Sequence, residues 1–401
     1  MVELNFPACL AEDFPTQLPR AISAVDRIIT SIEGADFSPL ARNSPGLDTS
    51  SWDWRTYLRC SIARMVHVLA ALEERGVTSG RVLDFGSYFG TFSLFLAEAG
   101  FTVDALDAYR RYAPALDGPV RLLGGAGVSL LDFDDVGREL ERIAADQYDV
   151  VLCMGVIEHI PHTPRYLLTA FDRVLKPGGQ LVMDTPNQAH IYNRQKLARG
   201  ESIYAALPTQ FLSERPFEGH HREYTLPEMV WMVEQIGHTD VRCETYNYSV
   251  YEQQKLVGRD EANHWAAVRD PLMRELLLTV STKSGRPAAA GRESGDWRRG
   301  FVDKETVWQR RLPSGAGTTT VSPESEQMLV ELQQEIEKRD ALIRDVNTRA
   351  VEDVSKRDGM LAALEAGSQA EIQRRDAIID RLRREWPLWR KLWARLGGPQ
   401  S

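Results

Sequence analysis

Acidic residues and closely spaced glycines form the first group that could do chemistry. Asp84, Gly86 and Gly90 lie in and just after the short run VLDF (82–85), and Asp107 ends the next apolar run, 17 residues after Gly90. Glycines let the backbone turn tightly and approach a ligand without an intervening Cβ. A carboxylate at the position of Asp107 can accept hydrogen bonds from both hydroxyls of a ribose. The alternative is a strand–turn–helix in which the glycines serve only the turn.

The spacing of this loop argues against a dinucleotide site. Gly86 and Gly90 are separated by three residues, so the G-x-G-x-x-G fingerprint is missing. The loop also opens with the acid Asp84, and a carboxylate suits an ammonium group better than a pyrophosphate. A second chemical pair, Glu158 and His159, follows the apolar run 148–154. The ordinary pKa of histidine, about 6.5, makes His159 a natural general base.

Alternating strands and helices are expected to position these residues. The expected strands are 82–85, 101–106, 128–133, 148–154 and 180–184. The expected helices are 91–99, 112–123 and 164–175. The last helix ends at KPGG, whose glycines are a stop signal. Buried strands that alternate with helices predict an α/β fold with a doubly wound, Rossmann-like, mostly parallel sheet. In such sheets the ligand binds at the carboxyl ends of the strands.

The order of these motifs resembles the class I S-adenosylmethionine-dependent methyltransferases. The resemblance covers roughly residues 55–283. It rests on VLDFGSYFG (82–90), on Asp107, on the block 148–187 and on HHREYTLPEMVWMVEQIG (220–237). It implies that the chain is an enzyme and that S-adenosyl-L-methionine is its cofactor.

The resemblance also assigns the cofactor site. It implies that Asp84, Gly86 and Gly90 line the methionine end and that Asp107 holds the ribose. Asp134 is expected near the adenine, with Asp132 as the competing choice, and Ser87 and Met154 are assigned to the same site. Tyr88 departs from the family pattern, because the family usually has glycine at this position. We therefore expect the loop, but not the strand and carboxylate framework, to differ.

The catalytic assignment follows from the chemistry of the donor. The sulfonium methyl is already activated, so the main requirement is to align the acceptor with it. A hydroxyl acceptor also benefits from a general base, and we assign His159 and Glu158 to catalysis. Glu158 could instead cap the helix near Pro164 or cradle the cofactor methionine. Similar quinone-pathway O-methyltransferases carry a metal-binding acid where this chain has Gly155, and the histidine spacing is unconvincing, so no metal is expected.

The segment 188–224 follows the fifth expected strand and is polar and aromatic. Segments of this kind are commonly lids or substrate walls, and we assign His220, His221 and Tyr224 to substrate binding. Arg194, Lys196, Arg199, Arg215 and Arg222 make the segment basic, which favours an anionic acceptor. The alternative is a surface loop with scattered charges.

Composition excludes several functional classes. The 401 residues carry a net charge of −9, which argues against a nucleic-acid partner. No apolar run approaches the roughly 18 residues of a membrane-spanning helix. The N-terminus shows no secretory signal. Cys9, Cys60, Cys153 and Cys243 lie far apart, as in reduced cytosolic proteins. A cytoplasmic protein is expected.

Composition also divides the chain. We expect an N-terminal extension (1–54), a methyltransferase domain (55–283), a flexible linker (284–323) and a coiled coil (324–385). KRDALIRDV, KRDGMLAAL and RRDAIIDRL recur every 18 residues within the last segment, which is five helical turns. A helix this polar needs a partner. Self-association through 324–385, as a dimer or trimer, is therefore expected, and a single solvated helix is the alternative.

Residues 386–401 form a basic, tryptophan-rich amphipathic tail. Residues 381–401 contain six basic residues and one acid, a net charge of +5, around an apolar face with Trp386, Trp389 and Trp393. Such a helix suits an anionic membrane surface, reached through 386–397 at the inner membrane face. The tryptophans could equally seal the end of the coiled coil.

The functional expectation combines these parts. A methyltransferase with a coiled-coil spacer resembles, in architecture, the bacterial O-antigen chain-terminating methyltransferases. We therefore expect O-methylation of a sugar hydroxyl on a surface polysaccharide or glycolipid. The enzyme alternative is O- or N-methylation of a small metabolite. The alternative from another class is a degenerate methyltransferase fold that acts as a coiled-coil scaffold.

Overall fold

The computed structural model describes most of the first three hundred residues. The described residues are 8–41, 53–132, 140–161, 163–213, 217, 219–248, 270–284, 297–302, 338, 356, 373–377 and 380–381. The chain divides into two units, Met1–Pro313 and Ser314–Ser401. In the second unit the described residues are helical. The rest of the predicted coiled coil, most of the predicted linker and the whole tryptophan-rich tail lie outside the described residues.

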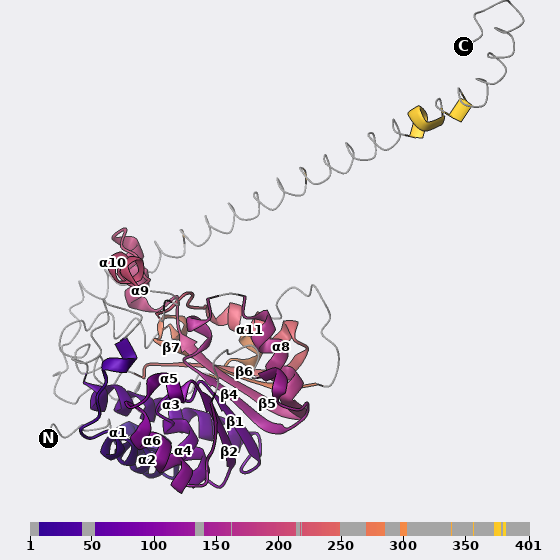
Figure 1. The fold of residues 1–401 in the computed structure, drawn as a ribbon. Helices are drawn as coiled ribbons and strands as arrows, with labels where there is room; N and C mark the ends of the chain where they lie inside the picture. The colour runs from indigo at the N-terminus through magenta and orange to yellow at the C-terminus, as the bar shows by residue number, and fades with distance from the viewer. Residues whose placement is uncertain are drawn as a thin grey trace, which may run out of the picture. The chain divides into compact units, whose positions relative to one another are not determined.

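A seven-stranded mixed sheet organises the described part of the first unit (Figure 1). The strand order is β3-β2-β1-β4-β5-β7-β6. Neighbours among the first five strands pair in parallel, and β7 pairs antiparallel with both β5 and β6. The strands are β1 (Arg81–Phe85), β2 (Thr102–Asp107), β3 (Ser129–Asp132), β4 (Tyr148–Met154), β5 (Leu175–Pro186), β6 (His238–Tyr246) and β7 (Leu276–Lys283). The predicted Rossmann-like, mostly parallel sheet is confirmed.

Helices cover both faces of the sheet. They are α1 (Ala8–Asp13), α2 (Gln17–Ser31), α3 (Trp54–Glu74), α4 (Thr91–Glu98), α5 (Tyr109–Tyr112), α6 (Asp117–Gly125), α8 (Arg165–Val174), α9 (Ile191–Ala198), α10 (Leu207–Leu212) and α11 (Leu226–Gln235). Within the described residues, four 3₁₀ turns complete the elements: η1 (Ser38–Ala41), η3 (Ile157–His159), η4 (Pro271–Met273) and η5 (Trp297–Gly300). None of the helices in the described part is both long and apolar enough to cross a membrane.

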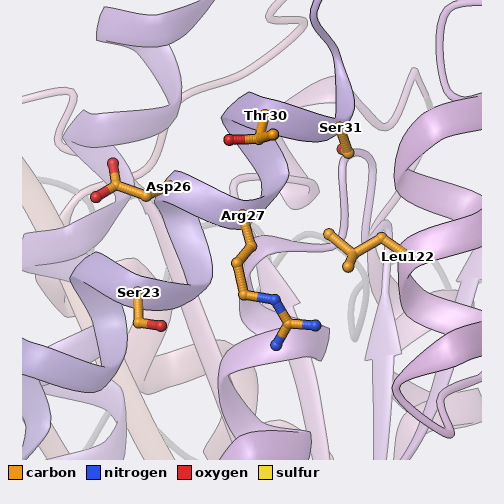
Figure 2. Close-up of a pocket in the computed structure, with 6 residues that line it drawn as sticks. All are labelled: Ser23, Asp26, Arg27, Thr30, Ser31 and Leu122. Carbon is orange, nitrogen blue, oxygen red and sulfur yellow. The ribbon is translucent and has the colours of Figure 1, made fainter.

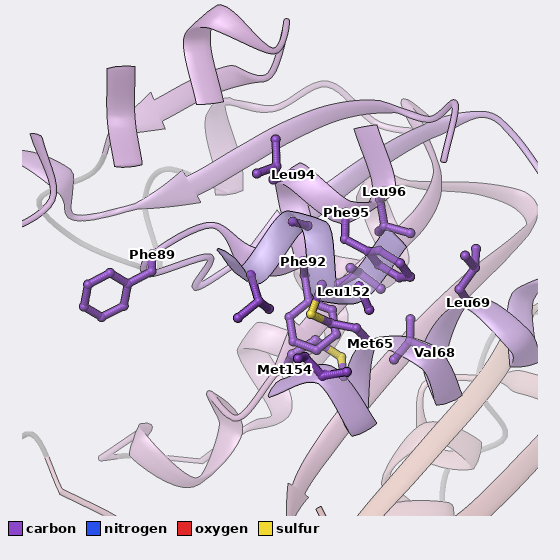
Figure 3. Packing of buried hydrophobic residues seen from close by; sticks show 14 of the residues in the cluster. Met65, Val68, Leu69, Phe89, Phe92, Leu94, Phe95, Leu96, Leu152 and Met154 are labelled. Atoms are coloured by element: carbon purple, nitrogen blue, oxygen red, sulfur yellow. The ribbon is translucent and has the colours of Figure 1, made fainter. Parts of the chain in front are cut away.

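Two hydrophobic cores lie on the two faces of the sheet, because successive side chains of a strand point to opposite faces. Val82 of β1 packs in one core with α2, α3 and α4, whereas Leu83 and Phe85 pack in the other with α8 and α11. Figure 3 shows the first core at close range, where Met65 of α3 lies by Phe92 of α4. Strands buried on both sides explain the continuous apolar runs from which they were predicted.

The predicted helix over 112–123 is wrong as a single element. The structure instead has α5 and α6, with Ala113 extended between them at ψ 141°. Ala113 precedes Pro114, and steric conflict with the proline ring disfavours helical backbone at the preceding residue. The predicted strand at 180–184 is also longer, because β5 already begins at Leu175. Strands β6 and β7 were not predicted.

The predicted N-terminal extension (1–54) contributes to the core of the same unit. Phe14 and Ile28 belong to the hydrophobic cluster that includes Val82 of β1. Helix α3 then begins at Trp54, where the Asp53 side chain caps it by accepting a hydrogen bond from the amide of Thr56. Residues before the methyltransferase motifs therefore cover one face of the sheet.

Phe171 gives a test of the packing on the second face. Its ring is fully buried and lies edge-on to Phe85, with ring centroids 5.0 Å apart. We expect Phe171→Ala to lower the free energy of unfolding by about 3–5 kcal/mol, because the substitution opens a cavity. Urea denaturation followed by circular dichroism measures the change. Tyr166→Ala, on the same helix at a side chain that is 73% exposed, should change stability by less than about 0.5 kcal/mol.

Candidate active site

The glycine turn after β1 is tightly packed. Gly86 and Gly90 have φ values of 74° and 76°, which L-residues with a Cβ rarely adopt. A Cβ on Gly86 would lie 2.4 Å from Val156 Cγ2, and one on Gly90 would lie 2.3 Å from Leu123 Cδ1. Both glycines are therefore required by space and by backbone conformation, and their assignment to the cofactor stays a prediction.

Tyr88 shapes this turn in an unusual way. It also has a positive φ, 49°, which costs a residue with a side chain on the order of 1–3 kcal/mol. Its amide donates a hydrogen bond to Asp107 Oδ2 at 2.6 Å. Its ring lies 4.5 Å from that of Phe89 and 6.2 Å from that of Trp54, measured between centroids. These contacts offset the backbone cost and connect the turn to the start of α3.

Asp84 and Asp107 place two buried carboxyl groups beneath the turn. Burial raises the pKa of each to about 6. Asp84 accepts a hydrogen bond from Ser93 Oγ at 2.5 Å, and Asp107 accepts from the amides of Tyr88 and Ala108. These hydrogen bonds favour the ionised form and limit the rise. Two desolvated carboxyl groups at the ends of β1 and β2 suit a positively charged ligand that carries ribose hydroxyls.

The other predicted cofactor residues lie around this turn, apart from one. Ser87 Oγ is 2.6 Å from the hydroxyl of Tyr109, a buried partner that sequence reasoning missed. Met154, at the end of β4, is buried in the first core. Asp132 forms an ion pair with Arg110. Asp134 lies outside the described residues.

A buried ion pair joins α3 to the end of β5. Arg64 Nε and Nη2 donate to the two carboxylate oxygens of Asp184 at 2.7 and 2.6 Å. A Cβ on Gly155 would lie 3.0 Å from Arg64 Nη2 and 3.6 Å from Glu158 Oε1. Burial works to lower the pKa of Arg64, but Asp184 reverses this effect, so the guanidinium stays charged. Arg64 thus places a positive charge beside the end of β4.

Arg64 was not predicted, although the sequence carries a signal for it. It is the charged residue within the apolar run IARMVHVLAAL (62–72). A charge in the buried stretch of a helix is unusual unless it has a partner. The partner, Asp184, is 120 residues away in the chain, and its identity depends on the fold.

Glu158 is buried at the end of β4. Thr185 Oγ1 donates to its Oε2 at 3.1 Å, and its carbonyl oxygen accepts from the amide of His221 at 2.7 Å. Its side chain therefore turns toward β5 and does not cap α8. Burial raises the pKa of Glu158 to about 7, although the neighbouring His220 acts in the opposite direction. This carboxyl group can exchange a proton near neutral pH.

Glu158, His159 and His220 come together, although His220 is distant in the sequence. One side-chain nitrogen or oxygen of each lies within 4.8 Å of the others. The rings of His159 and His220 meet edge to face, with centroids 4.8 Å apart. Such a set could exchange protons or hold a divalent cation. The expectation that the enzyme uses no metal stays a prediction.

The remaining predicted substrate residues point elsewhere. The ring of His221 hydrogen-bonds the carbonyl of Phe217 at 3.0 Å, and Tyr224 is buried in the second core. Arg222 forms an ion pair with Glu228, and Arg199 forms one with Glu201. These partners neutralise charges from which an anionic acceptor was inferred. Of the three residues assigned to substrate binding, His220 alone contributes to the cluster with Glu158.

A surface pocket on the first unit lies apart from all these residues. Figure 2 shows its lining, which comes from α2 and α6: Ser23, Asp26, Arg27, Thr30, Ser31 and Leu122. Arg27, near its centre, forms an ion pair with Glu98 of α4. No residue assigned to the cofactor or to catalysis lines this pocket, so the carboxyl ends of the strands remain the candidate site.

Comparisons with known proteins bear on the family of this chain. Residues 54–242 match a family described as "Methyltransferase domain". A ubiquinone biosynthesis O-methyltransferase of Xanthomonas axonopodis pv. citri is 30% identical over 217 residues, which cover 52% of this chain and 82% of that protein. The corresponding enzyme of Pseudomonas savastanoi pv. phaseolicola is 33% identical over 118 residues, covering 29% of this chain and 49% of the relative.

Among solved structures, phosphoethanolamine N-methyltransferase 2 of Haemonchus contortus, in complex with S-adenosyl-L-methionine, has 16% identity and a TM-score of 0.38, covering 63% of this chain and 61% of its own. The strand order, the glycine turn between two buried carboxyl groups, the matched family and the extended similarity to the Xanthomonas enzyme agree with one another. The chain belongs to the class I S-adenosylmethionine-dependent methyltransferases.

Proposed function

We propose that this methyltransferase transfers the methyl group to a hydroxyl oxygen of a small-molecule acceptor. The observation that carries the proposal is the cluster of Glu158, His159 and His220 at the end of β4. A hydroxyl is a weak nucleophile until its proton leaves, so groups that accept protons near neutral pH accelerate its methylation. A neutral amine already offers a lone pair and needs no base before transfer.

S-adenosylmethionine is the methyl donor of the family to which the chain belongs. When bound, it supplies a methyl group on a positively charged sulfur. The residues present fit such a donor. Asp107 would hold the ribose hydroxyls, the backbone of the turn at Gly86 would approach the ligand closely, and the carboxylate of Asp84 adds negative charge beneath the turn.

Two acceptor classes are in competition. The relatives' name, ubiquinone biosynthesis O-methyltransferase, supports a small-molecule hydroxyl acceptor. The second candidate is the sugar hydroxyl of a glycolipid or surface polysaccharide, inferred from the predicted tail. Leu207, Phe211 and Leu212 of α10, in the segment between β5 and α11, are exposed. These apolar side chains would suit an acceptor with a large apolar part.

An acceptor screen with the full chain tests the proposal. Labelled S-adenosylmethionine is offered with dihydroxybenzoates, primary amines and lipid-linked glycans, and mass spectrometry locates the transferred methyl group. We expect the methyl group on oxygen, with Asp107→Asn, which should bind the donor more weakly, as a control of lower activity. Transfer to nitrogen would refute O-methylation, and transfer to the glycan alone would select the second candidate.

Asp107→Asn should weaken donor binding on the order of 10–100-fold, because a hydrogen-bond acceptor with full charge is replaced by a neutral amide. Isothermal titration calorimetry measures the dissociation constant. The affinity of the unmodified protein should rise with pH through about 6, because a protonated Asp107 must first release its proton. The variant should lose part of this pH dependence.

Asp104→Asn is a suitable control for this measurement. Asp104 lies on the same strand but pairs with Arg81 and Tyr148, so the donor affinity of this variant should change little. An Asp107→Asn protein that binds the donor as tightly as the unmodified protein at pH 8 would remove Asp107 from the site.

We further propose that residues 324–385 associate with a second copy, with 386–397 contacting an anionic membrane. The support is the 18-residue repeat and the net charge of +5 in 381–401. A protein ending at Pro313, the boundary of the first unit, should be monomeric in light scattering and should keep donor binding. A truncated protein that still forms oligomers would contradict the role of the repeat.

A further inference from the structure

A carboxylate–histidine pair lies at the edge of the cluster and belongs to the segment before α11. His220 Nδ1 is 2.9 Å from Glu223 Oε1. The second oxygen of Glu223 accepts a hydrogen bond from Asn193 Nδ2 at 3.1 Å. The Glu223 side chain is only 13% exposed. Both oxygens of one carboxylate therefore hold it in place against the imidazole.

Asn193 connects this pair to the end of the sheet. Its Nδ2 also lies 3.3 Å from the carbonyl oxygen of Asn187 and 3.2 Å from that of Gln188. Asn187 follows β5 directly and is itself buried. The position of Glu223 is thus fixed by backbone that continues from β5. A side chain fixed in this way is suited to orienting a partner.

His220 also contacts the residues assigned to catalysis. Its ring meets that of His159 edge to face, and one side-chain nitrogen or oxygen of each of Glu158, His159 and His220 lies within 4.8 Å of the others. A carboxylate that accepts the Nδ1 proton leaves Nε2 as the nitrogen that can take up a proton. The carboxylate also stabilises the imidazolium that forms.

We propose that His220 is the general base that takes the proton of the acceptor hydroxyl, and that Glu223 is its positioning residue. The inference rests on the proposed O-methylation. As the oxygen–methyl bond forms and the sulfur–methyl bond breaks, the electron pair of the broken bond stays on sulfur and gives a neutral thioether. His220 Nε2 receives the hydroxyl proton and later releases it to water.

The electrostatics of the segment favour His220 in this role. Burial works to lower the pKa of His220, but Glu223 and Glu158 outweigh it and raise the value. Among the described residues, Glu158, His159 and Glu223 act on or contact the imidazole, and Arg64 acts on Glu158 from α3. Two carboxyl groups thus compensate the charge that His220 acquires during the reaction.

The pair can be tested without an acceptor. The full chain contains eight histidines, and NMR of protein labelled at the histidine Cε1 follows their titration, with His220→Gln assigning the signal. We expect Glu223→Gln to lower the pKa of His220 by about one unit or more, because an opposite charge at this distance shifts a pKa by about 1–3 units. Glu228→Gln, in the first turn of α11 and paired with Arg222, should leave it unchanged. An unaltered titration in Glu223→Gln would overturn the pair.

Activity with the acceptor found in the screen tests the base itself. We expect His220→Ala to lower kcat by about 10²–10⁴-fold, with unchanged donor affinity and partial rescue by added imidazole. Glu223→Gln should shift the acidic limb of the pH profile of kcat to lower pH. If His159→Ala abolishes kcat while His220→Ala spares it, His159 is the base. If EDTA abolishes the activity of the unmodified protein and Mg²⁺ restores it, the cluster holds a cation and the inference fails.

These outcomes separate the two proposals. If the unmodified protein methylates only nitrogen, O-methylation fails and the role of His220 as base fails with it. If the protein methylates oxygen and His220→Ala keeps full kcat, O-methylation stands and only the assignment of the base is overturned.

Discussion

Parallel pairing of the central strands is the constraint on which the site depends. In this register Phe85 of β1 lies beside Leu106 and Cys153, and Met154 of β4 lies beside Asp184 of β5. Whatever follows these positions in the chain is delivered to the same edge of the sheet. The glycine turn, Asp107 and Glu158 meet there for this reason, although helices and strands separate them in sequence.

Burial gives this edge its electrostatic character. Asp84, Asp107 and Glu158 all have raised pKa values, with desolvation as the largest cause. The ion pair of Arg64 and Asp184 places a compensated charge among them. Removing one member of such a pair leaves a buried charge without a partner, which costs about 3–5 kcal/mol. The low polarity around these groups makes their charged forms unfavourable. For the same reason, a charged ligand or a transferred proton changes their ionisation strongly.

The sequence predicted the parts of the fold and site that local patterns specify. Apolar runs identified β1 to β4 within one or two residues, and the turn at Gly86 and Gly90 was recognised because its glycines are required by its own geometry. The structure also brings Glu158 and His159 together, as their adjacency implied. Strands β6 and β7 were missed, since antiparallel edge pairing depends on partners far along the chain.

The missed site residues share this dependence on distant partners. Arg64 is held by its ion pair with Asp184, and Glu223 is held by its contacts with His220 and Asn193. His221 and Tyr224 were assigned to substrate binding because they lie in the same motif as His220. In the structure, the His221 ring contacts a backbone carbonyl oxygen and Tyr224 packs in the second core. The motif located the segment, but only packing determined which of its side chains reaches Glu158.

The aromatic contacts of Tyr88 have a consequence for protein engineering. Phe37, which precedes the matched region, stacks on Trp54 with ring centroids 5.2 Å apart. Trp54 in turn packs against Tyr88 and Phe89 of the glycine turn. The matched region begins at residue 54, so a chimera joined there would separate Phe37 from the rings that it covers. A graft of the methyltransferase domain into another scaffold would therefore have to carry the segment that contains Phe37, since Phe37 packs on Trp54 and Phe89, which contact Tyr88 in the glycine turn.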